Sequence, residues 1–408
     1  MKNNIEVISF EKCTGCNACI QICPKQCISH NTIDGFWYPI VDNKKCIECG
    51  RCLKACLAFN KFNNRTPLKC YAGYNKNEKI RLKSSSGGIF FELAKLTINN
   101  GGIVFGAVFD KNWNVTHVSA KSIDEVQQML GSKYVQSNTL DTYKECKTYL
   151  NEGKEVLYSG TPCQIGGLHK FLGKNYNNLF TVDLICHGAP SPGVWQRYLK
   201  ETFSPKTMIF QAKMPKNTSP DISSFIRSIK FRDKTYGWEK FSFVVNSKLI
   251  SKRGSNMILL SHIYSKNPYM KGFLNDLFLR ESCYNCPSRK LSSQSDITIG
   301  DFWGVHKLNM DDMNDHKGLS IITINTTKGN VIFKEISSNF VIRELSYAQA
   351  VESNSNLIQI ANKNTKKVNK FKKFEHKMLL SQAIEKTLHI NIIKKIIIKI
   401  KYKLRIIK

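Results

Sequence analysis

Two runs of cysteines near the start of the chain constrain its fold more than any other feature. Each run has the spacing Cys-x2-Cys-x2-Cys-x3-Cys, and Pro24 directly follows the first of them. The cysteines of the two runs are Cys13, Cys16, Cys19 and Cys23, then Cys46, Cys49, Cys52 and Cys56. Thiolates separated by two residues share one tight turn and can hold adjacent corners of an iron–sulfur cube. The fourth thiolate of each run follows a longer step, so it points away from its own loop.

This spacing resembles that of the bacterial two-cluster ferredoxins, in which the fourth cysteine of each run reaches the other cluster. It therefore predicts two [4Fe–4S] clusters that exchange their fourth ligands. The first cluster is expected on Cys13, Cys16, Cys19 and Cys56, and the second on Cys46, Cys49, Cys52 and Cys23. Leu57 follows the second run where a proline is usual. Because that proline shapes the turn and gives iron no ligand, the assignment is unchanged.

Two other uses of these cysteines fit the pattern less well. A disulfide framework belongs to secreted proteins, and residues 1–10 contain no apolar signal core. Structural zinc takes four ligands per site and has no use for the third cysteine step of each run. The total of 15 cysteines fits a reducing cytoplasm, where thiolates bind metal. No run of about 18 uncharged apolar residues is present, so we expect a cytoplasmic protein without a membrane-spanning helix.

The formal net charge of +30 indicates anionic partners, such as nucleic acid, acidic lipid, an acidic redox protein or a phosphorylated cofactor. Residues 363–408 carry about 13 of these charges, and the Lys/Ile pattern after Asn391 fits a basic amphipathic helix on the inner face of a membrane. A strand or a disordered tail fits that segment as well. Nucleic acid is not expected as a partner, because arginines and aromatic residues are not interleaved. The richness in Asn, Ile and Lys is also typical of an AT-rich genome.

Alternating helical and strand patterns follow the cysteine runs. Residues 89–98 are expected as a helix, 101–109 as a buried strand, 155–158 as a strand that leads into a helix, and 181–185 as a further strand. This alternation is typical of an α/β domain with ligand loops at the strand ends. The predicted fold class is therefore α+β or α/β, with an N-terminal bacterial-type dicluster ferredoxin fold followed by a mixed α/β domain.

The expected domain limits follow from these patterns. Residues 1–60 form the ferredoxin domain, 61–69 a polar linker, 70–355 the mixed α/β domain and 356–408 a basic tail. Small residues at 84–88 precede a helix, and the free backbone N–H groups of a helix start suit a cofactor phosphate. An ordinary serine cap is the alternative interpretation of these residues.

Four further cysteines stand beside Gly or Pro at expected strand ends or in turns. They are Cys163, Cys186, Cys283 and Cys286. Four thiolates from distant loops can converge on one site, and a zinc ion or burial as small apolar side chains are the alternatives. We interpret the isolated Cys27, Cys70 and Cys146 as structural.

Several motifs in this order resemble the family of coenzyme F420 hydrogenase/dehydrogenase beta subunits. The resemblance covers roughly residues 70–350. Its motifs are the loops 84–88 and 130–134, Gly-Thr-Pro-Cys-Gln at 160–164, Asp-Leu-Ile-Cys-His-Gly at 183–188, the pair Cys283-x2-Cys286, and Asp-Ile-Thr-Ile-Gly-Asp-Phe-Trp-Gly at 296–304. Members with an N-terminal two-cluster ferredoxin are similar to proteins found among bacterial surface-polysaccharide genes.

The resemblance implies FAD and a third [4Fe–4S] cluster. Carried over, the ligands of that cluster are Cys163, Cys186, Cys283 and Cys286. We expect contacts to FAD from the residues of the two loops and of the Thr-Pro-Cys-Gln motif. These are Ser84, Ser85, Ser86, Gly87, Gly88, Ser132, Lys133, Tyr134, Thr161 and Gln164.

The resulting functional hypothesis is an iron–sulfur flavoprotein oxidoreductase. Electrons would pass from a reduced carrier, such as a ferredoxin or flavodoxin, through the clusters to FAD and on to a small-molecule substrate. A deazaflavin or a sugar- or lipid-linked intermediate is the expected substrate class. His187 beside Cys186 is a candidate proton donor, with a structural role as the alternative. The alternative function is an electron-transfer subunit of a larger redox complex, with no substrate of its own.

Overall fold

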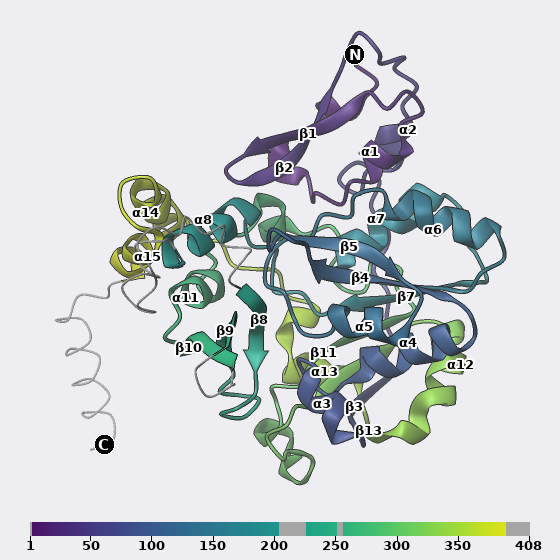
Figure 1. Ribbon diagram of the computed structural model, residues 1–408. Coiled ribbons are helices and arrows are strands. Elements are labelled where there is room, and N and C mark those ends of the chain that lie inside the picture. Colours follow the sequence, from purple (N-terminus) through teal and green to yellow (C-terminus); the bar gives the residue numbers. More distant parts are fainter. Residues whose placement is uncertain (1, 204–225, 251–255, 389–408) are drawn as a thin grey trace, which may run out of the picture.

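The computed structural model describes residues 2–203, 226–250 and 256–388 (Figure 1). The N-terminal cysteine runs lie in a small module built on one antiparallel hairpin, β1 (Ile28–Ile33) and β2 (Phe36–Val41). Each cysteine run continues into a short helix, α1 (Ala18–Ile22) or α2 (Arg51–Lys54). Single 3-10 turns, Ile5–Val7 and Phe10–Lys12, precede them. The apolar core of this module is small and contains cysteines among its members, so cluster binding and stability are linked.

The main domain is organised around one mixed sheet of eight strands. Its order is β13-β3-β12-β11-β7-β6-β4-β5. The strands are β3 (Lys69–Asn75), β4 (Ile103–Phe109), β5 (Val115–Ala120), β6 (Val156–Gly160), β7 (Leu179–Leu184), β11 (Ile297–Asp301), β12 (Ser320–Ile324) and β13 (Phe340–Leu345). The four central strands β4, β6, β7 and β11 are parallel, and the outer pairs are antiparallel. Parallel strands end at one edge of a sheet, so the loops after them are brought together there.

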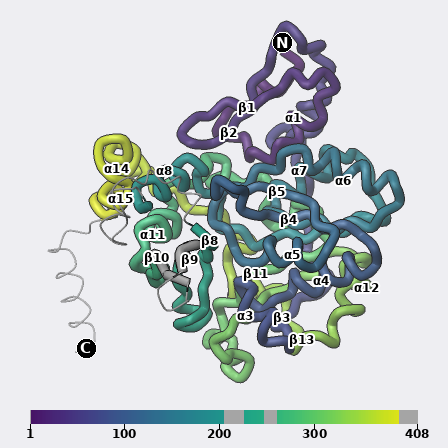
Figure 2. Tube along the Cα trace, viewed as in Figure 1, coloured from purple at the N-terminus to yellow at the C-terminus, as the bar shows by residue number. Residues whose placement is uncertain are grey.

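Helices cover both faces of this sheet, as buried parallel strands require. On one face, α4 (Ile89–Asn99), α5 (Ile123–Met129) and α12 (Thr327–Ile336) contribute to a shared apolar core. On the other face, α6 (Thr142–Asn151) and α7 (Pro162–Leu172) pack with the N-terminal module, which Figure 2 draws in purple above them. The short helices α3 (Glu78–Lys83) and α13 (Tyr347–Ser353) flank β3. The mixed α/β fold and the N-terminal dicluster ferredoxin domain that the sequence predicted are both confirmed.

A second, antiparallel sheet lies beside the main one. It consists of β8 (Ile226–Asp233), β9 (Ser242–Ile250) and β10 (Asn256–Ile263) in the order β10-β9-β8. Four helices share its aromatic core: α8 (Pro192–Thr202), α11 (Pro268–Leu274), α14 (Thr365–Glu375) and α15 (Leu380–Leu388). Phe371, Leu380 and Ile384 of the last two helices are almost fully buried in that core.

These contacts bear on the region that the sequence assigned to a basic tail, residues 356–408. Its first part contains α14 and α15, and both helices pack on the main domain. One apolar face of each helix is buried there, although the region as a whole is rich in lysine. The Lys/Ile segment after Asn391 lies outside the described residues, so its amphipathic character stays a prediction. Among the described residues, no helix is both long and apolar enough to cross a membrane.

The N-terminal module is seated on the main domain by close backbone contacts. Gly167 of α7 faces Cys16, and a Cβ at that position would lie 2.9 Å from the Cys16 Sγ. The Gly193 N–H donates to the Gly35 carbonyl at 2.9 Å, and a Cβ at Gly193 would lie 2.5 Å from the Gly35 Cα. Buried Gln21 accepts from the Tyr143 N–H at 2.8 Å. Glycine at both contacts permits an approach that any side chain would obstruct.

Candidate functional site

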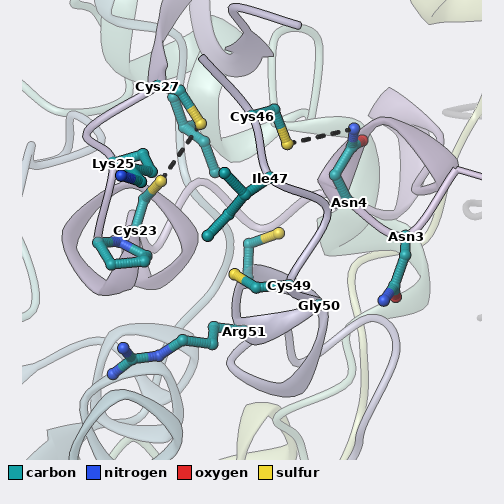
Figure 3. Close-up of a pocket in the computed structure, with 13 residues that line it drawn as sticks. Asn3, Asn4, Cys23, Lys25, Cys27, Cys46, Ile47, Cys49, Gly50 and Arg51 are labelled. Carbon is teal, nitrogen blue, oxygen red and sulfur yellow. Dashed lines mark hydrogen bonds between the residues drawn. The ribbon is translucent and has the colours of Figure 1, made fainter.

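Five cysteines surround the outer cavity of the N-terminal module, which has a volume of about 310 Å³. They are Cys23, Cys27, Cys46, Cys49 and Cys52. Figure 3 shows the sulfur atoms of Cys23, Cys27, Cys46 and Cys49 arranged around this hollow. The Asn4 side-chain amide donates to the Cys46 Sγ at 3.8 Å. Four of these cysteines are those that the sequence assigned to the second cluster.

Cys27 is the additional member of this set. Its Sγ lies 3.4 Å from the Cys23 Sγ, and its side chain is buried. Burial and the neighbouring Cys23 raise the pKa of Cys27 to about 12. Sequence reasoning could not place Cys27 at the cavity, because this cysteine stands outside the spacing of both runs.

The inner cavity of the module, of about 460 Å³, is lined by Cys13, Cys16, Cys19 and Cys56. These are the four cysteines that the sequence assigned to the first cluster, so the crossed arrangement of the fourth cysteines is present. Burial and the Cys16 thiolate raise the pKa of Cys56 to about 11. Among the described residues, no three His, Cys, Asp or Glu side chains form a group that could hold a single metal ion. The sulfurs instead line two wider hollows.

The four dispersed cysteines converge in the main domain. Cys163 is in the first turn of α7 after β6, Cys186 follows the end of β7, and Cys283 and Cys286 lie in and after the 3-10 turn Glu281–Asn285. Burial raises the pKa of Cys163 well above its usual range, and the charges of Cys286, Cys186 and Cys283 add to this shift. Since such mutual effects require proximity, the four thiols lie near one another at the carboxyl edge of the parallel strands, and each of them is partly exposed.

Polar groups around this site point at the sulfurs. The Ala189 N–H donates to the Cys283 Sγ at 3.3 Å, and the Thr161 Oγ1 lies 3.3 Å from the Cys163 Sγ. Hydrogen bonds of this kind stabilise thiolate ligands and tune a cluster. Burial raises the pKa of Cys283 to about 12, with the Cys186 charge as the next cause. Four neighbouring thiolates would repel one another without a cation, so this donor set fits an iron–sulfur cluster.

Thr161 and Gln164 act as the cap of α7. The Gln164 Oε1 accepts from the Thr161 N–H at 2.9 Å, and the Gln164 Nε2 donates to the Ser137 carbonyl at 3.1 Å. These bonds fix the helix start that carries Cys163. Their side-chain polar atoms are thus occupied by the protein, and their predicted contact with FAD stays a prediction.

His187 forms a pair with Asp276. The His187 Nε2 lies 2.7 Å from the Asp276 Oδ1, and its ring packs edge-on against Phe273 at 5.1 Å. The histidine is partly exposed and its carboxylate partner fixes the ring orientation. The geometry is compatible with proton transfer and equally with a structural ion pair, so the catalytic role stays a prediction.

The two loops predicted to bind a cofactor phosphate lie side by side. The Ser85 Oγ accepts from the Ser132 N–H at 2.5 Å and lies 2.8 Å from the Ser132 Oγ. The Lys133 Nζ donates to three carbonyls at the end of α5, those of Met129, Leu130 and Gly131. Burial lowers the pKa of Lys133 to about 7. In this arrangement Lys133 caps a helix end rather than presenting a free ammonium to a phosphate.

The other members of the first loop serve mainly to build the fold. The Ser84 Oγ donates to the Ile80 carbonyl and the Ser86 Oγ to the Leu319 carbonyl. The Gly87 N–H donates to the Ser320 Oγ, and a Cβ at Gly87 would lie 2.4 Å from the Gly73 carbonyl oxygen. Gly88 has φ +85° at the start of α4. A bulky residue at Gly87 would therefore disturb strand packing whether or not a cofactor is bound.

Sequence reasoning missed a buried arginine at the same edge. Arg232 of β8 donates to the Asp301 Oδ2 at 2.7 Å and to the Tyr134 hydroxyl at 3.2 Å. Its Nε and Nη2 have no hydrogen-bond partner among the described residues. The guanidinium lies over the rings of Phe241 and Trp303. Two unpaired N–H donors on a buried cation suit an anionic or carbonyl-bearing ligand.

Two aromatic rings and a second buried cation extend this group. Trp303 stacks on Trp238 with ring centroids 4.7 Å apart and is 43% exposed. The Lys234 Nζ donates to the carbonyls of Arg81, Ser86 and Lys317. Burial and the Arg232 charge lower the pKa of Lys234 to about 7. Only the Asp-Phe-Trp-Gly motif signalled this group in the sequence, because Arg232 lies on β8 and Lys234 just after it, in a segment with no motif of its own.

The cysteine cavities and the group of four thiols in the main domain indicate an iron–sulfur protein, and comparison with known families agrees. Residues 12–60 match the family model described as 4Fe-4S dicluster domain. Residues 153–349 match the model that describes the C terminus of the coenzyme F420 hydrogenase/dehydrogenase beta subunit. The chain therefore joins a segment that matches 4Fe–4S dicluster domains to one that matches the C terminus of F420 hydrogenase/dehydrogenase beta subunits, as the sequence resemblance indicated.

Individual relatives are distant or match over short stretches. One of the subunits of the F(420)H(2) dehydrogenase of Methanosarcina mazei is 22% identical over 193 residues, which are 44% of this chain and 55% of the relative. An uncharacterized protein from the rpl9-rpl11 intergenic region of Porphyra purpurea is 42% identical over 53 residues, 12% of this chain and 69% of the relative. A chain of the F420-reducing [NiFe] hydrogenase complex of Methanosarcina barkeri has 18% identity and a TM-score of 0.45, covering 77% of this chain and 94% of its own. The chain spans about half the length of the Methanosarcina mazei relative.

Proposed function

We propose that this chain is an iron–sulfur flavoprotein oxidoreductase that moves electrons from a reduced carrier to a small-molecule substrate. The observation that carries the proposal is the spatial order of the three cysteine sites, which follow one another from the outer end of the N-terminal module into the main domain. The outer cavity is separated from the main domain by the inner cavity, and the inner cavity adjoins the segment and the helix that hold the third site.

The contacts of the inner cavity support this route. Cys16 packs against Gly167 of α7, the helix whose first turn carries Cys163. The 3-10 turn that carries Cys283 packs against the turn Phe10–Lys12, which directly precedes Cys13. Two ligands of the proposed first cluster thus adjoin the two elements that hold the proposed third one. Short separations of this kind favour direct electron transfer from one cluster to the next.

The outer cavity is suited to receive electrons from a protein carrier. Cys49 is exposed and Ile47 is 58% exposed beside it. Lys25 and Arg51 line the same hollow. An apolar patch with a basic border fits an acidic redox protein such as a reduced ferredoxin or flavodoxin, because charge complementarity speeds association.

The flavin is proposed at the carboxyl edge of the main sheet, next to the third cysteine site. When bound, FAD exchanges single electrons with clusters and electron pairs with organic substrates. Arg232 offers two free donors, the stacked Trp303 offers a ring face, and the paired loops at Ser85 and Ser132 offer polar groups. The side chains present are therefore compatible with an anionic, aromatic cofactor. The substrate class proposed is a deazaflavin or a sugar- or lipid-linked intermediate.

A second candidate is an electron-transfer subunit without a substrate of its own. The name of the Methanosarcina mazei relative, a dehydrogenase subunit, favours it. In that case the flavin would pass its electrons to a partner protein. The two candidates differ in whether a small acceptor alone is reduced by the isolated chain.

The experiment is anaerobic purification of the full chain with iron, sulfide and flavin measured together. We expect about twelve iron atoms, twelve sulfides and one FAD per chain. The same sample, reduced with dithionite and mixed with a deazaflavin, should reduce it if the first candidate is correct. Eight irons, or zinc in place of the third cluster, would contradict the three-cluster arrangement. Full reduction of FAD without reduction of any added small acceptor would favour the second candidate.

A further inference from the structure

Arg280 is a fully buried arginine between the dicluster domain and the third cysteine site. Its relative exposure is 0%, and it precedes Cys283 by three residues. Its backbone carbonyl accepts from the Cys283 N–H at 2.9 Å, while its side chain extends into the N-terminal module. One residue thus connects the proposed first and third clusters.

The guanidinium is directed at Cys13. The Nη2 donates to the Cys13 Sγ at 3.4 Å and to the Trp37 carbonyl at 2.9 Å, and the Nε donates to the Cys13 carbonyl at 2.6 Å. The Nη1 donates to the Gln136 Oε1 at 3.1 Å. A cation–π contact with Tyr38 at 4.2 Å completes the surroundings.

None of these hydrogen bonds goes to a carboxylate, within the part of the chain that the structure describes. A buried cation without a counter-charge is costly and ordinarily has an anionic partner. An iron–sulfur cube held by four thiolates carries net negative charge and gains a further electron on reduction. The Cys13 sulfur beside the guanidinium places that charge at the arginine.

We propose that Arg280 is a positioning and potential-setting residue for the cluster at Cys13, Cys16, Cys19 and Cys56. Its fixed positive charge and its bond to the Cys13 sulfur stabilise the reduced cluster over the oxidised one. The first cluster therefore accepts an electron from the outer cluster more readily and stands next to the third. This inference rests on the proposed cluster occupancy of these four cysteines.

The test is a redox titration of the anaerobic holoprotein, followed by the low-temperature EPR signals of its reduced clusters. Arg280→Gln removes the charge and keeps a polar side chain. In this variant the EPR component of the first cluster should appear only at a more reducing potential than in the wild type. At a fixed potential, the ratio of reduced to oxidised first cluster should be at least tenfold lower than in the wild type. For a one-electron couple that ratio corresponds to about 59 mV. The other components should titrate as in the wild type.

Gln136→Glu is the second variant, because it neutralises the arginine without removing it. The carboxylate would take the place of the amide oxygen that accepts from Nη1. We expect a shift of the same component in the same direction. Arg197→Gln is the matched control, since Arg197 bonds to Glu201 and to the carbonyls of Glu375 and Met378 rather than to a cysteine. It should change no component.

Unchanged titration of every component in iron-replete Arg280→Gln protein would overturn the inference. If that variant loses iron, Gln136→Glu decides, and an unmoved component there overturns it. Wild-type protein without iron at Cys13, Cys16, Cys19 and Cys56 would instead defeat the proposed function. The two failures are therefore distinguishable.

Discussion

The two kinds of cysteine site in this molecule are built in opposite ways. The N-terminal sites take all eight predicted ligands from residues 13–56, and repeated spacing brings them together. The main-domain site takes its four cysteines from three segments between residues 163 and 286, and only the parallel sheet unites them. The first kind is encoded by local sequence, whereas the second is a property of the whole fold. Their responses to change should differ accordingly.

The largest expected effect is the loss of iron from one kind of cysteine site, and not from the other, when a cysteine is substituted. Cys283→Ser should remove about four of twelve irons and leave the N-terminal pair intact, because the other ligands of the third site come from distant loops. Iron analysis and EPR of the reduced protein measure this. Cys146→Ser is the control: Cys146 is a fully buried residue of α6 in an apolar core without other candidate ligands of the third site, so its substitution should leave all the iron. Loss of all twelve irons from Cys283→Ser would show that the sites are not independent.

A smaller effect is expected at the flavin group of the main domain. Arg232→Leu should lower FAD occupancy several-fold. The substitution removes the buried Nε and Nη2 donors, which have no hydrogen-bond partner among the described residues. FAD released on denaturation, relative to protein, is the measurement. Arg197→Leu supplies a comparison with a partly buried arginine whose side chain bonds to Glu201 and to the carbonyls of Glu375 and Met378. Equal FAD content in the two variants would remove Arg232 from the cofactor site.

The smallest effect is a pH dependence of flavin affinity. Burial and the Arg232 charge lower the pKa of Lys234 from 10.5 to about 7. The ammonium form is therefore complete below pH 7 and is lost as the pH rises through 7, so affinity for an anionic cofactor should fall between about pH 6 and 8. Fluorescence titration of flavin-free protein checks this. Lys234→Arg keeps the charge at high pH and should flatten the profile; a steep profile in that variant would assign the titration to another group.

The contrast between the sites also explains how far sequence reasoning reached. The spacing of the two runs was sufficient to predict the dicluster domain, and the crossed fourth cysteines line the expected cavities. The order of motifs indicated the family of the second domain and its mixed α/β fold. The strands β6 and β7 and the helix α7 were predicted to within a few residues, because each combines an apolar run with a Gly or Pro boundary.

What sequence reasoning missed depends on tertiary contacts. Arg232 has neighbours more than 65 residues away, at Asp301 and Tyr134, and no local pattern encodes those meetings. Helices α14 and α15 looked like a tail because the segment 363–408 as a whole is rich in lysine, although one face of each helix is buried. A signal for Arg280 was present: Arg280, Cys283, Cys286 and Arg289 recur at intervals of three. The role of Arg280 could be inferred only from the fold, in which its side chain contacts Cys13.

The position of Arg280 has a consequence for biosynthesis. The last N-terminal cysteine, Cys56, leaves the ribosome more than 200 residues before Arg280 does. At 5–20 residues per second, the interval is roughly 10–45 s. During it Cys13 lacks the hydrogen bonds that Arg280 later donates, and the surface of Cys16 that α7 covers is still open. The order of synthesis thus leaves the inner cysteines uncovered on the nascent chain, and the completed main domain afterwards closes over them.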